Sequence, residues 1–273
     1  MKAFEGILIC TDLDGTLLRK DKSISAENLR AIEYFKSQGG YFTFITGRMP
    51  FFVSDIYNTV SPNAPFGCIN GGGLYDHRTG EYVWTQTLPH AALDLVEYAD
   101  RELPGIGIQV NTFEKIYFAT ENSAMAYFRK VTGIPNITRH YRDVSEPLAK
   151  IVFGDEDEAK IERLDKLLHA HPDAEHFDFI RSERTLYEIL PKGIHKGVPL
   201  QKLCEYLNIS PEKTVAVGDY NNDVGMLRFA KCGVAVANAT TEAKAAADYI
   251  TVSNEEHAIA RIIADIADKK IVL

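Results

Sequence analysis

The chain is organised around the stretch GILICTDLDGTLL, residues 6–18. Its apolar run at residues 7–10 predicts a buried strand, and Asp12 and Asp14 follow that strand directly. In an open α/β sheet, chemistry gathers where strands end at their carboxyl edge. Two carboxylates at such an edge repel each other and are costly to desolvate unless a cation or a proton lies between them. The alternative is an acidic turn without function, because Asp-Gly is a common turn pair.

The composition favours a soluble protein of two domains with a small-molecule partner. A length of 273 residues is long for one domain and sufficient for two. The proportions of hydrophobic residues (45%) and charged residues (25%) are ordinary for a globular chain. The formal net charge of -8 argues against a broad surface that binds nucleic acid. One local cation can still hold a small phosphate ester.

The cysteines and the apolar segments favour a cytoplasmic location. The four cysteines are Cys10, Cys68, Cys204 and Cys232. They lie far apart, so we expect neither a disulfide framework nor a zinc site. The first apolar run is too short for a signal peptide, and no segment approaches the length of a membrane span. We therefore expect no membrane partner, and either a monomer or a weak homo-oligomer.

Residues 1–86 alternate between predicted strands and helices. Ser25 has the position of a helix N-cap, and Gly39 follows the predicted end of that helix. The apolar patterns predict strands at 7–10, 41–45 and 65–69, helices at 26–38 and 50–60, and a hairpin with strands at 74–76 and 82–84. The alternation of strand and helix predicts a parallel sheet.

The rhythm changes over residues 87–191, where helices and strands come in pairs and blocks. This order is typical of an α+β module with an antiparallel sheet. We expect helices at 90–102, 122–131 and 156–170, and strands at 106–110, 115–118, 150–153, 177–181 and 185–190.

The first rhythm resumes after residue 191. We expect helices at 195–207, 222–230, 241–247 and 255–267, and strands at 214–217, 234–237 and 249–252. The predicted fold is therefore α/β, with a Rossmann-like core built on a central parallel sheet. Residues 1–86 and 192–273 form this core, and residues 87–191 form an inserted α+β domain.

Polar side chains stand at four predicted strand ends or helix starts in the core. They are Asp12 with Asp14, Thr46 with Gly47, Lys196, and Asp219 with Asp223. Carboxylates hold a hard divalent cation such as magnesium, and a free carboxylate can attack phosphorus to form an aspartyl phosphate. A hydroxyl, backbone N–H groups and an ammonium can hold the other phosphoryl oxygens. This set of residues therefore fits the chemistry of phosphoryl transfer.

Each of these residues also has a structural explanation when taken alone. Thr46 could cap the next helix, and Lys196 could be a solvated surface lysine. Asp219 and Asp223 could be turn and N-cap residues. Their joint occurrence, each at a strand end or a helix start, favours a functional site.

Four segments resemble the motifs of the haloacid dehalogenase-like superfamily. They are DLDGT (12–16), ITGR (45–48), GIHKG (193–197) and GDYNND (218–223). The insert between the second and third motifs resembles that of the Cof-like subgroup, subclass IIB, in which the insert is an α/β cap. The pair Asn70-Gly71 and the segment EILPKG, residues 188–193, resemble that subgroup as well.

The resemblance implies roles for the two aspartates of the opening stretch and for a metal. Asp12 is implied to be the nucleophile. Asp14 is implied to be the general acid for the leaving oxygen and then the base that activates water. The implied magnesium ion (Mg²⁺) is held by the Asp12 carboxylate, the Asp14 backbone carbonyl and Asp219.

The resemblance also implies how the phosphoryl group is bound. Its oxygens are implied to be held by the side chains of Thr46, Lys196 and Asn222 and by the N–H groups of Leu13 and Gly47. Asp223 is implied to orient the lysine or a water on the metal.

Specificity is expected to lie in the cap or beside the phosphate site. The candidates are Arg48 in the core, the loop near Phe113, and the strand residues around Tyr187 and Glu188. Two residues depart from the family pattern, Tyr220 and His195. Tyr220 could reach toward the cap and narrow the pocket, or could simply pack as an aromatic residue. His195 could contact substrate, or could be a surface or cap histidine.

The leading hypothesis is a magnesium-dependent phosphatase that hydrolyses a small phosphorylated metabolite, either a sugar phosphate or a nucleotide-like cofactor, through an aspartyl phosphate. One alternative is a sugar phosphomutase of a neighbouring subgroup. Another is a receiver-like regulatory phospho-acceptor, which also combines an acidic cluster, a threonine and a lysine. The second aspartate, Asp14, argues against the receiver because it would hydrolyse the phosphorylated form.

Overall fold

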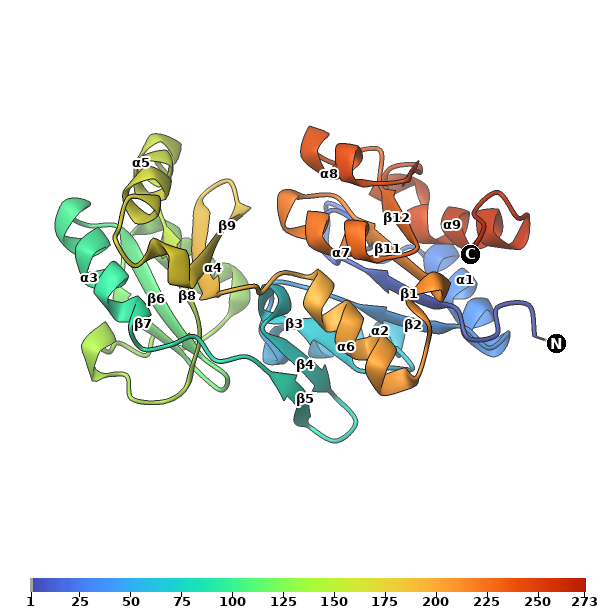
Figure 1. Ribbon diagram of the computed structural model, residues 1–273, viewed down its shortest axis with the longest axis horizontal. Coiled ribbons are helices and arrows are strands. Elements are labelled where there is room, and N and C mark those ends of the chain that lie inside the picture. Colours follow the sequence, from blue (N-terminus) through green and yellow to red (C-terminus); the bar gives the residue numbers. More distant parts are fainter. Residues whose placement is uncertain (1) are drawn as a thin grey trace. The chain divides into compact units, whose positions relative to one another are not determined.

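A computed structural model describes residues 2–273, and the chain divides into two compact units. The first unit is formed by the chain up to Thr85 together with His195–Leu273, and the second by Gln86–Ile194. Figure 1 shows the chain leaving the first unit after β5 and returning to it before α6. The first unit contains a five-stranded and a three-stranded sheet, the second unit contains one five-stranded sheet, and each unit has its own helices.

The first unit is built on a five-stranded parallel sheet, as predicted for a Rossmann-like core. Its order is β13–β12–β11–β1–β2. The strands are β1 (Leu8–Thr11), β2 (Tyr41–Phe44), β11 (Thr214–Gly218), β12 (Cys232–Ala235) and β13 (Tyr249–Ile250). Strand β1 lies between β11 and β2, and all four of its residues are buried. A strand covered on both faces is expected to be a continuous apolar run, and this is the pattern in the sequence.

The helices of the first unit follow the strands as expected. They are α1 (Ala26–Ser37), α2 (Ser54–Val60), α6 (Gly197–Leu207), α7 (Val224–Phe229), α8 (Thr241–Ala246) and α9 (Ala258–Ala267). The Ser25 side chain accepts the N–H of Asn28 at 3.2 Å, so Ser25 is the N-cap of α1. The Asn28 carboxamide in turn accepts the N–H of Ala260 at 3.0 Å, which joins α1 to α9.

The strand predicted at 65–69 does not continue the parallel sheet along its length. Strand β3 (Phe66–Cys68) joins β4 (Gly73–Asp76) and β5 (Glu81–Thr85) in a separate antiparallel sheet. One isolated parallel bridge, between Ile45 and Gly67, links β3 to the end of β2. The turn at 69–71 has three consecutive positive φ angles and sends β4 back along β3.

The second unit is an α+β module with an antiparallel sheet, as predicted. Its sheet has the order β7–β6–β8–β10–β9. The strands are β6 (Gly107–Thr112), β7 (Ile116–Thr120), β8 (Leu148–Gly154), β9 (Phe177–Glu183) and β10 (Leu186–Pro191), and the helices are α3 (Ala92–Glu102), α4 (Ser123–Thr132) and α5 (Glu158–His169). Apolar side chains of α3, α5 and one sheet face form its core, among them Val96, Leu164, Ile108, Ile151 and Ile189.

The other face of this sheet carries buried polar side chains. Glu188 and Gln109 both lie opposite Val152 on neighbouring strands, and Asn111 lies opposite Lys150. Because side chains alternate between faces along a strand, these residues share one face. All four polar side chains are buried, and Lys150 Nζ lies 2.9 Å from Glu188 Oε2. We call Gln109, Asn111, Lys150 and Glu188 the polar face of the second unit.

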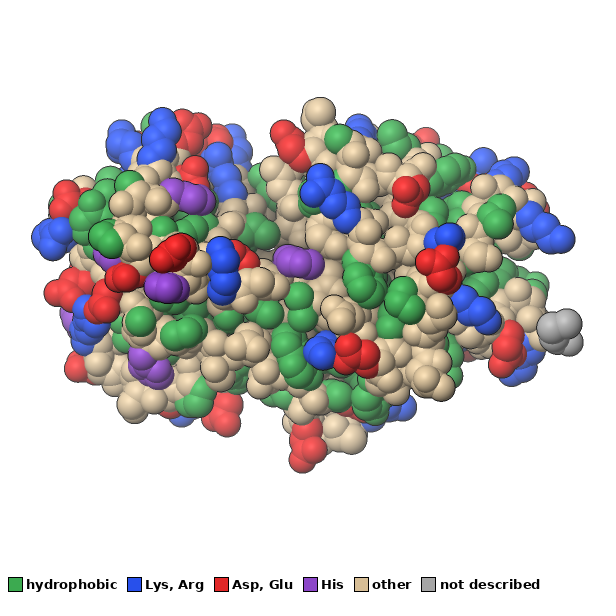
Figure 2. Space-filling view, viewed as in Figure 1, with side chains coloured by type: hydrophobic (Ala, Val, Ile, Leu, Met, Phe, Trp, Pro, Cys, Tyr) green, Lys and Arg blue, Asp and Glu red, His purple; other side chains and the backbone are tan. Residues whose placement is uncertain are grey.

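The outer surface carries charges of both signs. Figure 2 shows acidic and basic side chains interspersed over the face drawn. Across residues 2–273, none of the helices combines the length and the apolar character that crossing a membrane would require.

Candidate active site

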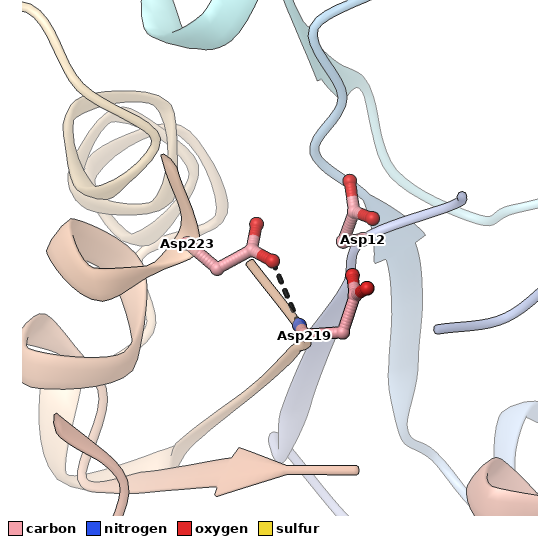
Figure 3. A group of neighbouring side chains, drawn as sticks. All are labelled: Asp12, Asp219 and Asp223. Atoms are coloured by element: carbon pink, nitrogen blue, oxygen red, sulfur yellow. Dashed lines mark hydrogen bonds between the residues drawn. The ribbon is translucent and has the colours of Figure 1, made fainter. Parts of the chain in front are cut away.

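The carboxyl edge of the parallel sheet brings together residues from three distant parts of the sequence. Asp12 directly follows β1, Asp219 directly follows β11, and Lys196 is the N-cap residue of α6. Figure 3 shows the carboxylates of Asp12 and Asp219 next to each other, with that of Asp223 directed toward them. The sequence predicted that these residues would meet.

Lys196 is the centre of this cluster. Its Nζ lies 2.6 Å from Asp12 Oδ1 and 2.6 Å from Asp223 Oδ1. The side chain is 1% exposed, so the alternative of a solvated surface lysine is wrong. Burial alone would lower the pKa of Lys196, but the carboxylates of Asp12 and Asp223 outweigh it and raise this pKa above its ordinary value. The lysine is therefore held as an ammonium.

Asp223 connects this lysine to the turn after β11. Its Oδ2 accepts the N–H of Asp219 at 2.8 Å and the N–H of Tyr220 at 2.9 Å. Asp223 is thus a turn residue, as one interpretation proposed, and it also binds Lys196. A Cβ atom at Gly218 would lie 2.5 Å from the Cβ of Asp223, which explains the glycine at the end of β11.

The carboxylates of Asp12 and Asp219 carry unbalanced negative charge. Burial raises the pKa of Asp12 well above its ordinary value, and Lys196 opposes this rise. Burial and the neighbouring Asp223 raise the pKa of Asp219 to about 7, although the Thr16 hydroxyl donates to its Oδ1 at 3.0 Å. Three carboxylates share one ammonium, and a divalent cation would offset the remaining repulsion.

The donor set of the cluster fits such a cation. One oxygen from each of Asp12, Asp219 and Asp223 can be chosen so that the three lie within 4.8 Å of one another. An all-oxygen set suits magnesium. The backbone of the loop after β1 also approaches this set, because a Cβ atom at Gly15 would lie 2.4 Å from Asp219 Oδ2. Gly15 has a φ of 81°, which favours glycine at this close approach.

The Asp14 side chain lies outside the cluster and is held by two cations. Arg48 Nε and Nη2 donate to its two oxygens at 2.8 and 2.7 Å, and Lys22 Nζ donates at 2.7 Å. Burial would raise the pKa of Asp14, but the hydrogen bonds and charges of Arg48 and Lys22 outweigh it and lower this pKa. Asp14 is therefore an ionised proton acceptor in this arrangement. No sequence pattern indicated that Lys22 would contact Asp14.

The residues predicted to bind phosphate lie around the same sheet edge. Thr46 is buried, and its Oγ1 accepts the N–H of Arg48 at 3.2 Å. The next helical segment starts after Met49, which makes no side-chain cap, so the alternative of Thr46 as its cap is wrong. Asn222 Nδ2 donates to Asn70 Oδ1 at 3.1 Å.

The remaining predicted residues have these positions. The Leu13 side chain is fully buried, and its carbonyl accepts the N–H of Leu18 at 2.8 Å. His195 is exposed, and its Nδ1 accepts the N–H of Gly197 at 3.1 Å, so it supports the start of α6. Tyr187 lies in the apolar core of the second unit and its hydroxyl binds Asp165, on the opposite sheet face from Glu188. Tyr187 therefore packs within the second unit, on the sheet face away from Glu188.

Comparisons with known proteins agree with this geometry. A family model described as haloacid dehalogenase-like hydrolase matches residues 9–263. The chain is 31% identical over 270 residues to the 5-amino-6-(5-phospho-D-ribitylamino)uracil phosphatase YitU of Bacillus subtilis strain 168, with 94% of this chain and 96% of that protein covered. It is 28% identical over 291 residues to YwtE, another 5-amino-6-(5-phospho-D-ribitylamino)uracil phosphatase of Bacillus subtilis strain 168. That match covers 93% of this chain and 96% of YwtE.

A solved structure shows the same similarity in three dimensions. It is the crystal structure of a haloacid dehalogenase-like hydrolase from Bacteroides thetaiotaomicron. The TM-score is 0.83 at 26% sequence identity, and the match covers 96% of this chain and 100% of that chain. The similarity therefore includes both units.

The raised pKa of Asp219 predicts how cation binding depends on pH. With a pKa of about 7, Asp219 is protonated at pH 5.5 and ionised at pH 8. Because a metal ligand must be deprotonated, the apparent affinity for Mg²⁺ should be about 30-fold higher at pH 8 than at pH 5.5. Isothermal titration calorimetry at both pH values measures this difference.

The raised pKa of Asp219 also predicts how the stability of the folded chain depends on pH. Because the folded-state pKa is raised, the metal-free protein should lose stability as the pH rises from about 4 through 7, and Mg²⁺ should offset that loss. The Asp219→Asn variant is the matched control: it lacks the Asp219 contribution, so its Mg²⁺ affinity and its stability should depend less on pH than those of the wild-type chain. An Mg²⁺ affinity that is equal at both pH values would contradict this assignment.

Proposed function

This chain belongs to the haloacid dehalogenase-like hydrolase family, and we propose that it is a magnesium-dependent phosphatase that acts on a small phosphorylated metabolite through an aspartyl phosphate at Asp12. It belongs to the Cof-like subgroup of that family and is a phosphoric monoester hydrolase. The observation that supports the proposed mechanism is the position of Asp12. Its carboxylate directly follows β1, is held by Lys196 at 2.6 Å, and lies beside Asp219.

We propose that Asp12, Asp219 and the backbone carbonyl of Asp14 hold the magnesium ion. The Asp223 oxygens are already used, because one accepts from Lys196 and the other from two backbone N–H groups. When bound, magnesium would neutralise the carboxylates and the phosphoryl oxygens and thereby favour attack by an anion on an anion.

Asp12 is the proposed nucleophile. Its free carboxylate oxygen attacks phosphorus, so an Asp12 O–P bond forms as the ester P–O bond breaks. The leaving oxygen takes a proton from the Asp14 carboxyl group. In the second step water attacks the aspartyl phosphate, Asp14 accepts the proton of that water, and inorganic phosphate leaves. Asp12 is then regenerated as a carboxylate.

The ion pair of Arg48 with Asp14 suits the second step better than the first. A carboxylate held by Arg48 and Lys22 is a proton acceptor, whereas the first step needs a proton donor. We propose that Arg48 leaves Asp14 when substrate binds and contacts the substrate instead, so that Asp14 takes up a proton from solvent before it donates that proton to the leaving oxygen. The Asp14 carboxylate also argues against a receiver-like regulatory phospho-acceptor. By accepting a proton from water, it would promote hydrolysis of phosphorylated Asp12.

The proposed phosphate-binding groups are preorganised. Lys196, Thr46 and Asn222 are largely buried, with exposures of 1%, 2% and 9%. Together with the N–H groups of Leu13 and Gly47 they would surround the phosphoryl oxygens. Donors fixed before the reaction stabilise developing charge without a cost of reorganisation.

We propose that the second unit is the cap that selects the substrate. Two relatives are named for 5-amino-6-(5-phospho-D-ribitylamino)uracil, which carries a hydroxylated chain next to its phosphate. The polar face of the second unit offers donors and acceptors for such hydroxyl groups, among them Lys150, Glu188 and Asn111. A phosphate ester of a sugar or polyol is therefore the proposed substrate class.

The proposed reaction predicts metal-dependent release of phosphate that requires Asp12. The chain should hydrolyse p-nitrophenyl phosphate with Mg²⁺, and EDTA should abolish the activity. Asp12→Asn should lower kcat at least about 1000-fold, because it removes the nucleophile. The matched control is Asp55→Asn at an exposed position of α2, which should leave kcat unchanged. Undiminished turnover in EDTA or in Asp12→Asn would contradict the mechanism.

The proposed role of the polar face predicts a change in specificity. The double variant Lys150→Met with Glu188→Gln leaves no unpaired buried charge. It should lower kcat/KM for the ribityl phosphate compound about 10- to 100-fold, since lost hydrogen bonds to hydroxyls weaken binding. Hydrolysis of p-nitrophenyl phosphate, which has no hydroxylated chain, should change less than about threefold. Equal losses with both substrates would contradict the assignment.

A further inference from the structure

We propose that Asn70 is a positioning residue that aligns three phosphate-binding segments of the first unit. These segments are the loop at Thr46–Gly47, the start of α6 at Lys196, and the turn that carries Asn222. Asn70 would act through these groups and not by contact with the substrate. The inference rests on the proposed function, because that function gives these segments their role.

Asn70 lies in a turn with an uncommon backbone conformation. Ile69, Asn70 and Gly71 have φ angles of 59°, 51° and 113°. A β-branched residue such as Ile69 adopts positive φ only where surrounding contacts hold it, and such strain collects at functional sites. Ile69 and Asn70 are both fully buried.

The backbone of this turn is bonded to both sides of Gly47. The N–H of Asn70 donates to the Thr46 carbonyl at 3.1 Å, and the N–H of Ile69 donates to the Arg48 carbonyl at 3.1 Å. A Cβ atom at Gly47 would lie 2.7 Å from Asn70 Oδ1. The turn therefore fixes the path of the loop whose hydroxyl and N–H are proposed to bind phosphate.

The side chain and the following glycine reach the other two segments. Asn70 Oδ1 accepts a hydrogen bond from Asn222 Nδ2 at 3.1 Å, and this bond fixes the orientation of the Asn222 carboxamide. A Cβ atom at Gly71 would lie 2.3 Å from the carbonyl oxygen of His195, the residue before Lys196. Only glycine allows the turn to pack this closely on that backbone.

These contacts distinguish Asn70 from a buried asparagine with a purely structural role. The Asn28 carboxamide is equally buried and joins two helices through Ala260, away from the site. Loss of the Asn28 side chain should lower the stability of the fold and leave the activity unchanged. Loss of Asn70 should misplace groups that bind phosphate, and small displacements of such groups have large effects on rate.

The test compares Asn70→Gly with Asn28→Ala and with the wild-type chain. Glycine tolerates the φ of position 70, so this variant removes the carboxamide without adding strain; Asn70→Ala is the second variant. We expect kcat/KM for p-nitrophenyl phosphate to fall about 10- to 100-fold in both Asn70 variants. The inhibition constant of inorganic phosphate should rise by a similar factor. Asn28→Ala should change neither quantity.

A double-mutant cycle tests whether Asn70 acts through Asn222. Asn222→Ala alone and together with Asn70→Gly should have equal kcat/KM within about threefold, because the shared contact is lost once. Multiplied losses in the double variant, or an unchanged inhibition constant in both Asn70 variants, would overturn the inference. An inactive wild-type chain would overturn the proposed function and this inference with it. An active wild type with fully active Asn70 variants would overturn this inference alone.

Discussion

The ion pair between Lys196 and the two carboxylates of Asp12 and Asp223 is the interaction on which the site depends. One ammonium lies 2.6 Å from an oxygen of each, and all three groups are almost fully buried. Charges buried in this way are tolerated only when they are paired. The arrangement thus fixes the start of α6 and the turn after β11 relative to the end of β1, although these segments are far apart in the sequence.

The parallel sheet brings these charged groups together but leaves their negative charge unbalanced. Strand β1 lies between β11 and β2, so their carboxyl ends present Asp12, Asp219 and Thr46 at one edge. The three clustered carboxylates exceed the one ammonium in charge. A divalent cation would offset the remaining negative charge and, together with Lys196, would allow an anionic phosphate ester to bind beside the carboxylates. The proposed phosphatase reaction accounts for why such costly groups are buried together.

Much of the fold and of the cluster could be predicted, because both follow from local patterns. The apolar run before Asp12, the strand-end position of Asp219 and the helix-start position of Lys196 predicted the parallel core and the meeting of these side chains. Contacts between loop side chains could not be predicted. The ion pairs of Asp14 with Arg48 and Lys22 depend on how the loops fold, which no local sequence pattern indicates. The strand predicted at 65–69 lies at Phe66–Cys68, but its antiparallel sheet with β4 was not predicted, because the positive φ of Ile69 in the turn between them has no sequence signal.

The most direct test of the account is to trap the covalent intermediate on Asp12. The Asp14→Asn variant lacks the proposed base, so it should accumulate the aspartyl phosphate when mixed with p-nitrophenyl phosphate and Mg²⁺. After acid quenching, mass spectrometry of proteolytic fragments should find the fragment with Asp12 heavier by one phosphoryl group. The Asp12→Asn variant should show no such gain. A phosphoryl group on another residue, or none in an Asp14→Asn variant that still turns over, would contradict the account.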